Sequence, residues 1–402
     1  MAQISRQEVR FTFAVLIILI GLTACDARVT FFEAQNYPKQ LSDWGVLFVQ
    51  RQHLQFGARV LPYDLNTPLF SDYARKHRTV WMPDQSGAKV ASDGTFSFPV
   101  GTIISKTFYY PESADGMLLL AEPLVIDPEA VLDLGQVRLI ETRLLVKQAH
   151  GWDALPYLWN ESETEATLKI DGAVIALSTI SADADEVSSI NYVMPTRNEC
   201  ASCHASDHTS GKLLPIGLKN RHLNKDYRYA AGTESQLRRW REFGYLEQTQ
   251  KPMQANALWD PEGRDNLVHR ARSYLDINCG HCHNPRGAAD TSGLFLDYSE
   301  SDPTHLGICK PPIAAGRGSG GFYFSIVPGS AETSILSHRM KSIDPAVMMP
   351  ELGRTVPHKA GVELIETWID QMAGDCKPAA AGMPKIGLEV RISKISSQLL
   401  SD

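Results

Sequence analysis

Two short cysteine-histidine units constrain this chain more than any other feature of its sequence. Among its 402 residues there are seven cysteines, and four of them stand in the segments CASCH (200–204) and CGHCH (279–283). Each unit places two thiols three residues apart and a histidine directly after them, which is the attachment pattern of c-type haem. The two thiols can each add to a vinyl group of the macrocycle, and the next imidazole then faces the iron. We therefore expect two covalently attached haem c groups, with the attaching and iron-ligating residues Cys200, Cys203, His204, Cys279, Cys282 and His283.

Two other kinds of site use paired cysteines. Four cysteines in two such pairs can form a zinc ribbon, and a single pair can be a thioredoxin-type redox motif. A zinc ribbon does not need a histidine after both pairs. A thioredoxin motif follows a strand of a βαβ unit, and neither pair here has that context. The sequence favours haem over both alternatives.

The first 25 residues have the pattern of an export signal. Arg6 and Arg10 precede an apolar stretch, residues 11–21, that is short for a membrane span. The following Leu-Thr-Ala-Cys resembles a bacterial lipobox, which predicts a lipid on Cys25; a secretory peptide cut at a small residue is the alternative. Asp26 favours retention at the inner membrane. We expect a periplasmic protein that is anchored to the membrane through Cys25.

Composition excludes several classes of protein. The 39 basic and 46 acidic residues give a formal net charge of −7, which provides no electrostatic footprint for nucleic acid. Glycines 316, 318 and 321 match G-x-G-x-x-G, but the strand and helix that a nucleotide fingerprint requires do not flank them. Neither nucleic acid nor a nucleotide is an expected partner.

Cys309 and Cys376 remain after the other five cysteines are assigned. An even remainder in an oxidising compartment predicts a disulfide between them. Buried, unpaired thiols are the alternative.

Hydrophobic patterning predicts an α+β multidomain chain. Asp93-Gly94 and Asp171-Gly172 each lie between strand-like segments, which is the strongest short-range signal for a hairpin. Apolar periodicity becomes helical near residues 234–246, 264–277 and 362–372. We expect a β-sandwich or jelly-roll-like module followed by a mostly α-helical cytochrome c-type di-haem region. The predicted parts are a lipoprotein signal peptide (1–24), the β-rich module (25–190), the first haem region (191–250), the second haem domain (251–377) and a tail or added strand (378–402).

With these motifs in place, the chain resembles a family of bacterial cell-envelope di-haem c-type cytochromes. The resemblance rests on LPYDLNTPLFSDYARKHR (61–78), FPVGTIISKTF (98–108), IETRLL (140–145), YLWN (157–160), PTRNECASCH (195–204), ARSYLDINCGHCH (271–283) and MMPELG (348–353). The C-terminal part is similar to class I cytochrome c. In that class a methionine before the closing helix is the distal iron ligand, which implies Met349 for the second haem, with Met348 as its competitor.

The first haem has no comparable methionine-proline element. His222 occupies the equivalent interval, while His208, Met194, Met253 and an open iron are the alternatives. The resemblance implies an electron carrier that works between a redox donor and a redox acceptor of the cell envelope. A di-haem enzyme, peroxidase-like or a substrate oxidase, is the alternative if the first iron is open. A third hypothesis is that the β-rich module docks a partner dehydrogenase.

Overall fold

The computed structural model describes residues 27–122, 131–181, 187–205, 208–247, 254–259, 263–313 and 315–376. The predictions for residues 1–24, Cys25, Met253 and residues 378–402 therefore lie outside the described residues. Within the described ranges, no helix is long and apolar enough to cross a membrane.

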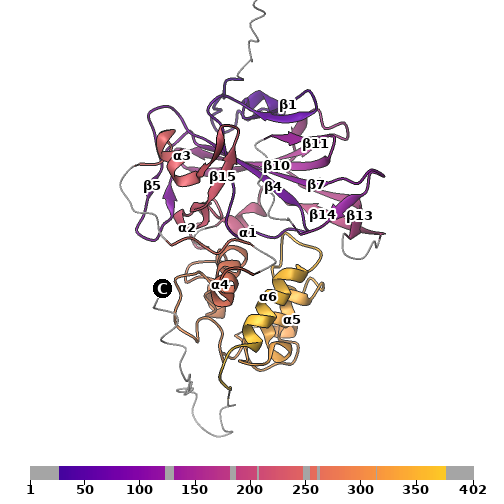
Figure 1. The fold of residues 1–402 in the computed structure, drawn as a ribbon, viewed down its shortest axis with the longest axis vertical. Coiled ribbons are helices and arrows are strands. Elements are labelled where there is room, and N and C mark those ends of the chain that lie inside the picture. The colour runs from indigo at the N-terminus through magenta and orange to yellow at the C-terminus, as the bar shows by residue number, and fades with distance from the viewer. Residues whose placement is uncertain are drawn as a thin grey trace, which may run out of the picture.

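A six-stranded antiparallel sheet forms the centre of the N-terminal half (Figure 1). Its strands run in the order β12 (Ala166–Leu168), β11 (Gly151–Trp159), β10 (Val137–Gln148), β7 (Ile103–Pro111), β4 (Arg75–Trp81) and β3 (Leu61–Tyr63). Consecutive residues of β7 and β10 point to opposite faces of the sheet and most of them are buried, as expected for a sheet covered on both sides.

Smaller sheets and hairpins surround this central sheet. One is β1 (Leu47–Gln50), β2 (His53–Phe56) and β9 (Leu132–Asp133); another is β14 (Val187–Met194), β13 (Ala173–Ser181) and β8 (Leu118–Leu120). The two-stranded pairs are β5 (Lys89–Val90) with β6 (Phe96–Ser97) and β15 (Asp226–Tyr229) with β16 (Gly232–Ser235). Short 3-10 helices are η1 (Ser42–Trp44), η2 (Asp290–Ser292), η3 (Gly316–Ser319) and η4 (Ala331–Thr333). The expectation of a β-rich N-terminal region is confirmed.

One of the two predicted hairpins is present. Asp93-Gly94 joins β5 to β6, which pair antiparallel. Asp171-Gly172 does not make a hairpin, because β12 before it pairs with β11 and β13 after it pairs with β14 and β8. Gly172, with φ +69°, turns the chain from one sheet into another. The prediction of a turn at Asp171-Gly172 is confirmed, and the prediction that its two flanking strands pair with each other is wrong.

Residues 191–376 are less helical than the sequence predicted. The helices are α1 (Cys200–His204), α2 (Asn220–Leu223), α3 (Gln236–Glu242), α4 (Leu267–Asn278), α5 (Ile335–Lys341) and α6 (Lys359–Asp370). Among the helices of the described residues, only α4 and α6, of 12 residues each, exceed two turns. Long irregular segments separate them, so a mostly α-helical region is not supported.

The hydrophobic cores connect regions that the sequence analysis separated. One face of the central sheet packs against residues 200–246 in a single cluster that includes Ile104, Cys200 and Trp240. The opposite face packs on β1 and β2 through Trp44 and Tyr157. A separate cluster joins α4, α5 and α6, which lie together at one end of the molecule (Figure 1). The first cysteine-histidine unit therefore shares its core with the β-rich region.

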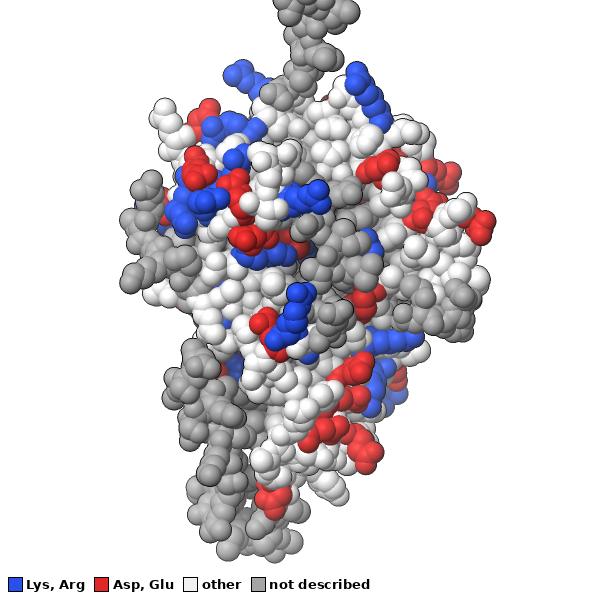
Figure 2. All heavy atoms as spheres, in the orientation of Figure 1, with Lys and Arg blue, Asp and Glu red and all other residues white. Residues whose placement is uncertain are grey.

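Charged side chains of both signs are interspersed around α3 on the face shown in Figure 2. Arg238 lies 3.3 Å from Glu234 and 3.8 Å from Glu242, at helical spacing along the solvent side. Exposed pairs of this kind contribute little to stability.

Candidate functional site

The first cysteine-histidine unit forms α1. Thr196 and Glu199 open this segment with reciprocal hydrogen bonds, since each side chain accepts from the other residue's backbone N–H. Cys200, at the start of α1, is buried in the core with 7% of its surface exposed. The local sequence thus places the first thiol against the central sheet.

His204 is a neutral imidazole whose Nε2 is available to bind a metal. Its Nδ1 lies 2.7 Å from the carbonyl oxygen of Leu214, and a carbonyl only accepts, so Nδ1 donates. Burial, with a smaller effect of the Lys106 charge, lowers the pKa of His204 to about 3. A neutral ring whose Nδ1 donates to the protein presents the Nε2 lone pair, the usual arrangement of a metal-ligating histidine.

The second unit follows α4 directly. Asn266 caps the start of α4, where its side-chain oxygen accepts from the N–H groups of Val268 (2.9 Å) and His269 (3.4 Å). The chain then tightens at residues 279–283, and Gly280 is required there because a Cβ would lie 2.7 Å from the carbonyl oxygen of Asp276. Helix α4 therefore ends directly before the motif, and a tight turn carries both thiols and the following histidine.

His283 repeats the arrangement of His204. Its Nδ1 is 3.4 Å from Ser292 Oγ, and that hydroxyl donates its own hydrogen to the carbonyl of Ala289 at 2.6 Å. The hydroxyl oxygen therefore accepts from Nδ1, which leaves the Nε2 lone pair available. Burial lowers the pKa of His283 to about 4, so this ring is also neutral at pH 7.

The fold brings the two units into contact, which the sequence did not predict. The ligand atoms of Cys203, His281 and Cys282 all lie within 4.8 Å of one another. Cys282 Sγ is 3.8 Å from the carbonyl oxygen of Ser202, in α1. Further along, the N–H of His208 donates to the carbonyl of Arg286 at 3.0 Å. Segments that are far apart in the sequence thus form one site.

Three such groups could also hold a borderline or soft metal ion. Cys200 and Cys279 are not members of that cluster, so it is not the four-cysteine zinc ribbon. Thioether formation would use the thiols of Cys203 and Cys282, which makes metal binding there and haem attachment mutually exclusive.

A pocket lies between α1 and the central sheet. Apolar side chains form most of its wall, and Cys200 and His204 reach it from α1. The apolar lining includes Leu65, Leu69, Ile104, Leu145, Leu155, Ile216, Leu218 and Ile277. Four cations from the sheet also line it, namely Lys76, Arg78, Lys106 and Arg143. An apolar cavity with a few convergent charged groups is the usual form of a cofactor site.

The four cations belong to one face of three adjacent strands and will be called the cation row. Sequence reasoning missed them as functional residues. Their signal in the sequence was weak: Lys76 and Arg78 alternate in β4, but β4 and β10 contain other polar and charged residues as well. What the sequence could not show is that these strands are neighbours. Burial and the charges of Arg143 and Arg78 lower the pKa of Lys106 to about 7.

His222, the predicted distal ligand of the first haem, has a different environment from the one expected. It is buried, with Nε2 3.1 Å from Asp276 Oδ2 and Nδ1 2.9 Å from the side-chain nitrogen of Asn256. Burial alone would raise the pKa of Asp276, but the hydrogen bond and charge of His222, with Lys219 and Arg221, hold it well below its usual range. Both nitrogens of His222 are engaged with protein, so the structure does not support iron ligation by this residue.

Of the alternative ligands of the first haem, Met253 lies outside the described residues, and the structure describes Met194 and His208. Met194 lies in the core between the central sheet and β13, 2% exposed. His208 is 42% exposed at its side chain and interacts with Asp290.

The segment with Met349 is tied to the protein on two sides. Arg354 Nη2 donates to the carbonyl oxygens of Met349 (2.9 Å), Ser342 (2.9 Å) and Arg339 (3.2 Å). From the β-rich region, Asp72 accepts hydrogen bonds from the next two residues, 355 and 356. Met349 is half-buried and the competing Met348 is buried, at 7% exposure. Both methionines remain candidate ligands of the second haem.

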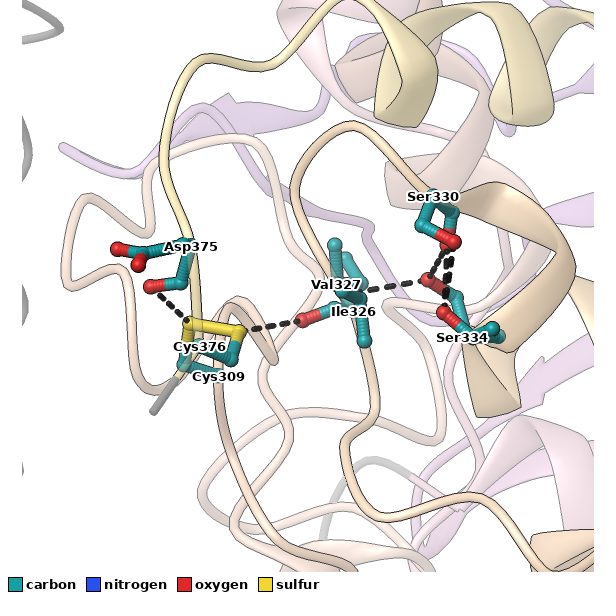
Figure 3. The surroundings of a disulfide bond; sticks show 8 residues. Cys309, Ile326, Val327, Ser330, Ser334, Asp375 and Cys376 are labelled. Carbon is teal, nitrogen blue, oxygen red and sulfur yellow. Dashed lines mark hydrogen bonds between the residues drawn. A yellow bond between two sulfur atoms is a disulfide. The ribbon is translucent and has the colours of Figure 1, made fainter. Parts of the chain in front are cut away.

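Cys309 and Cys376 form a disulfide, as the sequence predicted (Figure 3). Cys376 follows the end of α6, and Cys309 lies in the long segment after the second cysteine-histidine unit. Cys309 is 4% exposed and belongs to the core of the α4–α6 unit. The bridge fixes the C-terminal end of the described chain to that core.

Comparison with family models, curated proteins and solved structures finds no match for this chain.

Proposed function

We propose that the protein is a membrane-anchored periplasmic di-haem c-type cytochrome that relays electrons between redox proteins of the cell envelope. The observation that carries this proposal is the pair of Cys-x-x-Cys-His units that lie next to each other in the fold. Bound haem would supply an iron that accepts and releases one electron. The residues that would hold the two groups are the six cysteines and histidines at 200, 203, 204, 279, 282 and 283.

The first site suits a covalently bound macrocycle. The largely apolar pocket would receive a flat hydrophobic group, Cys200 lies at its wall, and neutral His204 has its Nε2 available for an iron. The residues present therefore fit haem c in donor chemistry and in the apolar character of the wall. His204 would act as the proximal ligand and its bond to Leu214 would fix the orientation of the ring.

Contact between the two units supports a relay. Cys203 and Cys282 would each carry a thioether to a different haem, and their sulfur atoms lie within 4.8 Å. Electron tunnelling falls steeply with distance, so attachment through adjacent sulfurs favours direct transfer from one group to the other.

The second unit has features that support a class I-like arrangement. Helix α6 packs on α4 at Gly361, where a Cβ would lie 2.3 Å from the hydroxyl of Tyr274. Only glycine permits this approach of the two helices. The segment with Met349 precedes α6, which is the position of the distal ligand in that class.

A second candidate function is a di-haem enzyme, peroxidase-like or a substrate oxidase. The engaged nitrogens of His222 favour it, because they leave the first haem without its predicted distal ligand. An open iron binds carbon monoxide in the reduced state, whereas a six-coordinate carrier does not. Carbon monoxide binding at one haem of two would favour the enzyme.

Haem content tests the proposal. The full chain is produced with export and cytochrome c maturation, and its intact mass is compared with that of the processed polypeptide. We expect two haems in the wild type. Cys203→Ser and Cys282→Ser should each disrupt haem attachment at one site, and the control Ser202→Ala should keep both haems. A wild-type protein without haem that binds one zinc ion through Cys203, His281 and Cys282 would contradict the proposal. Release of Cys25→Ser from the membrane fraction tests the anchor separately.

A further inference from the structure

The cation row is an unusual arrangement for the face of a sheet. Arg78 on β4 lies directly opposite Lys106 on β7, and Lys106 lies directly opposite Arg143 on β10. Lys76 is two residues before Arg78 and therefore points to the same face. Like charges in directly opposed positions destabilise a sheet. A fold that retains four of them around one pocket needs negative charge to offset them.

The protein's own carboxylates offset only part of this charge. Asp64 lies 2.8 Å from Arg78, but it also pairs with Lys225 at 3.0 Å. Glu141 binds Arg143 and also accepts from the hydroxyl of Tyr192 at 2.5 Å. These two carboxylates thus pair with only two cations of the row, Arg78 and Arg143, and with one cation outside it.

Lys76 and Lys106 have no carboxylate within 4 Å in the part of the chain that the structure describes. Both ammonium groups lie near the ring of Phe108, at 5.7 and 5.4 Å from its centroid, with Arg143 at 4.4 Å. Cation–π attraction offsets a small part of their repulsion. The two lysines are the members of the row that are free to bind a ligand.

The rest of the pocket defines what kind of ligand would bring the negative charge. Its walls are mainly apolar, so the ligand has a hydrophobic body. Lys76 and Lys106 would then meet acidic groups at the edge of that body, and carboxylates are the natural partners of paired lysines. Cys200 and His204 line the same pocket, so a haem attached there carries its own two carboxylates into it.

We propose that the cation row binds the propionate carboxylates of the first haem, with Lys106 and Lys76 as their ion-pair partners. This inference rests on the proposed haem attachment at Cys200 and Cys203. It gives the β-rich region a function: its central sheet forms one wall of the first haem site and neutralises the haem carboxylates. A soluble carboxylic acid could supply the same chemistry, and the experiment separates the two sources.

Redox titration of the holoprotein, monitored optically, tests the proposal. In Lys106→Met a haem carboxylate loses its counter-charge, which favours ferric iron, so the midpoint potential of one haem falls and that of the other stays. The potential that falls also becomes more dependent on pH, because the freed carboxylate takes up a proton on reduction. Lys106→Arg keeps the positive charge and should leave the midpoint potential at the wild-type value. Lys89→Met removes a lysine whose side chain is 73% exposed, and it changes neither potential.

The outcomes are distinguishable from those for haem attachment, because the haem mass of each variant is measured first. Two haems with both potentials unchanged in Lys106→Met would overturn this inference and leave the proposed function intact. Added succinate provides the second measurement. If succinate perturbs the absorption spectrum of the wild type but not that of Lys106→Met, a soluble acid occupies the cation row, and the proposal that the haem propionates bind there is wrong. If Lys106→Met does not fold, Lys76→Met makes the same test. A wild type without haem refutes the proposed function itself.

Discussion

Asp72 connects the β-rich region to the segment that holds Met349, and its replacement should separate them. The side chain is 3% exposed and its two oxygens accept three hydrogen bonds. The donors are the backbone N–H of Thr355 (2.6 Å), the hydroxyl of Thr355 (3.0 Å) and the N–H of Val356 (3.0 Å). These contacts join residues 283 and 284 positions apart, so no local structure replaces them.

The structure gives the size of the effect. Hydrogen bonds to a charged group contribute about 1.5 kcal/mol or more each, and burial of the carboxylate, which raises its pKa, offsets part of the sum. Asp72→Ala should therefore lower the free energy of unfolding by about 4 kcal/mol. Asp72→Asn keeps the shape and one acceptor oxygen, and it should cost about 1–2 kcal/mol. Asp115→Ala, at an exposed turn, is the matched control and should have almost no effect.

Urea denaturation measures these changes, and hydrogen exchange of the Thr355 and Val356 amides reports the contact directly. Faster exchange at these two amides in Asp72→Ala is expected even where α6, which begins three residues later, stays protected. In the haem-loaded protein, the absorption band of methionine-ligated ferric iron should also weaken, because the segment after Met349 is no longer held. The reasoning is refuted if Asp72→Ala costs less than about 1 kcal/mol and amide exchange is unchanged.

Three further predictions concern other parts of the molecule. Cys376→Ala opens a ring of 67 sequence positions and should lower the free energy of unfolding by about 4 kcal/mol; a loss below about 1 kcal/mol in urea would contradict it. The lowered pKa of Asp276 means that its carboxylate stabilises the fold above about pH 4 and that this stability is lost as the pH falls. Asp276→Asn should therefore flatten the fall in unfolding free energy in the acid range, and an unchanged slope would disprove this. Met349→His should lower the midpoint potential of one haem, because imidazole is the stronger donor to ferric iron. Loss of the methionine–iron band in Met348→Ala but not in Met349→Ala would identify the neighbour as the ligand.

Features that depend on neighbouring residues could be predicted from the sequence alone. The two Cys-x-x-Cys-His units, the β-rich N-terminal region and the helices at 267–278 and 359–370 all follow from local spacing or periodicity. The pairing of Cys309 with Cys376 could also be predicted, because only two cysteines remained after the motifs were assigned. The motifs and helices are each specified within one segment of the sequence. For the disulfide, assignment of the other five cysteines left only one possible pair.

Other features depend on which segments the fold brings together. The turn at Asp171-Gly172 was recognised, but its flanking strands joined different sheets, because pairing depends on partners elsewhere in the chain. His222 had the right position for an iron ligand by sequence interval, and the tertiary structure gave it Asp276 and Asn256 as partners instead.

The candidate site itself was decided by tertiary structure. Periodicity places Arg78, Lys106 and Arg143 inside strands, but only sheet order and register set them opposite one another. In the same way, each cysteine-histidine unit is complete in its own sequence, whereas the contact between Cys203 and Cys282 exists only after two distant segments pack together. The sequence by itself determined which chemical groups this protein carries, because those groups are specified by adjacent residues. The tertiary structure decided how the groups face one another, since burial and strand pairing act between residues that local patterns do not connect.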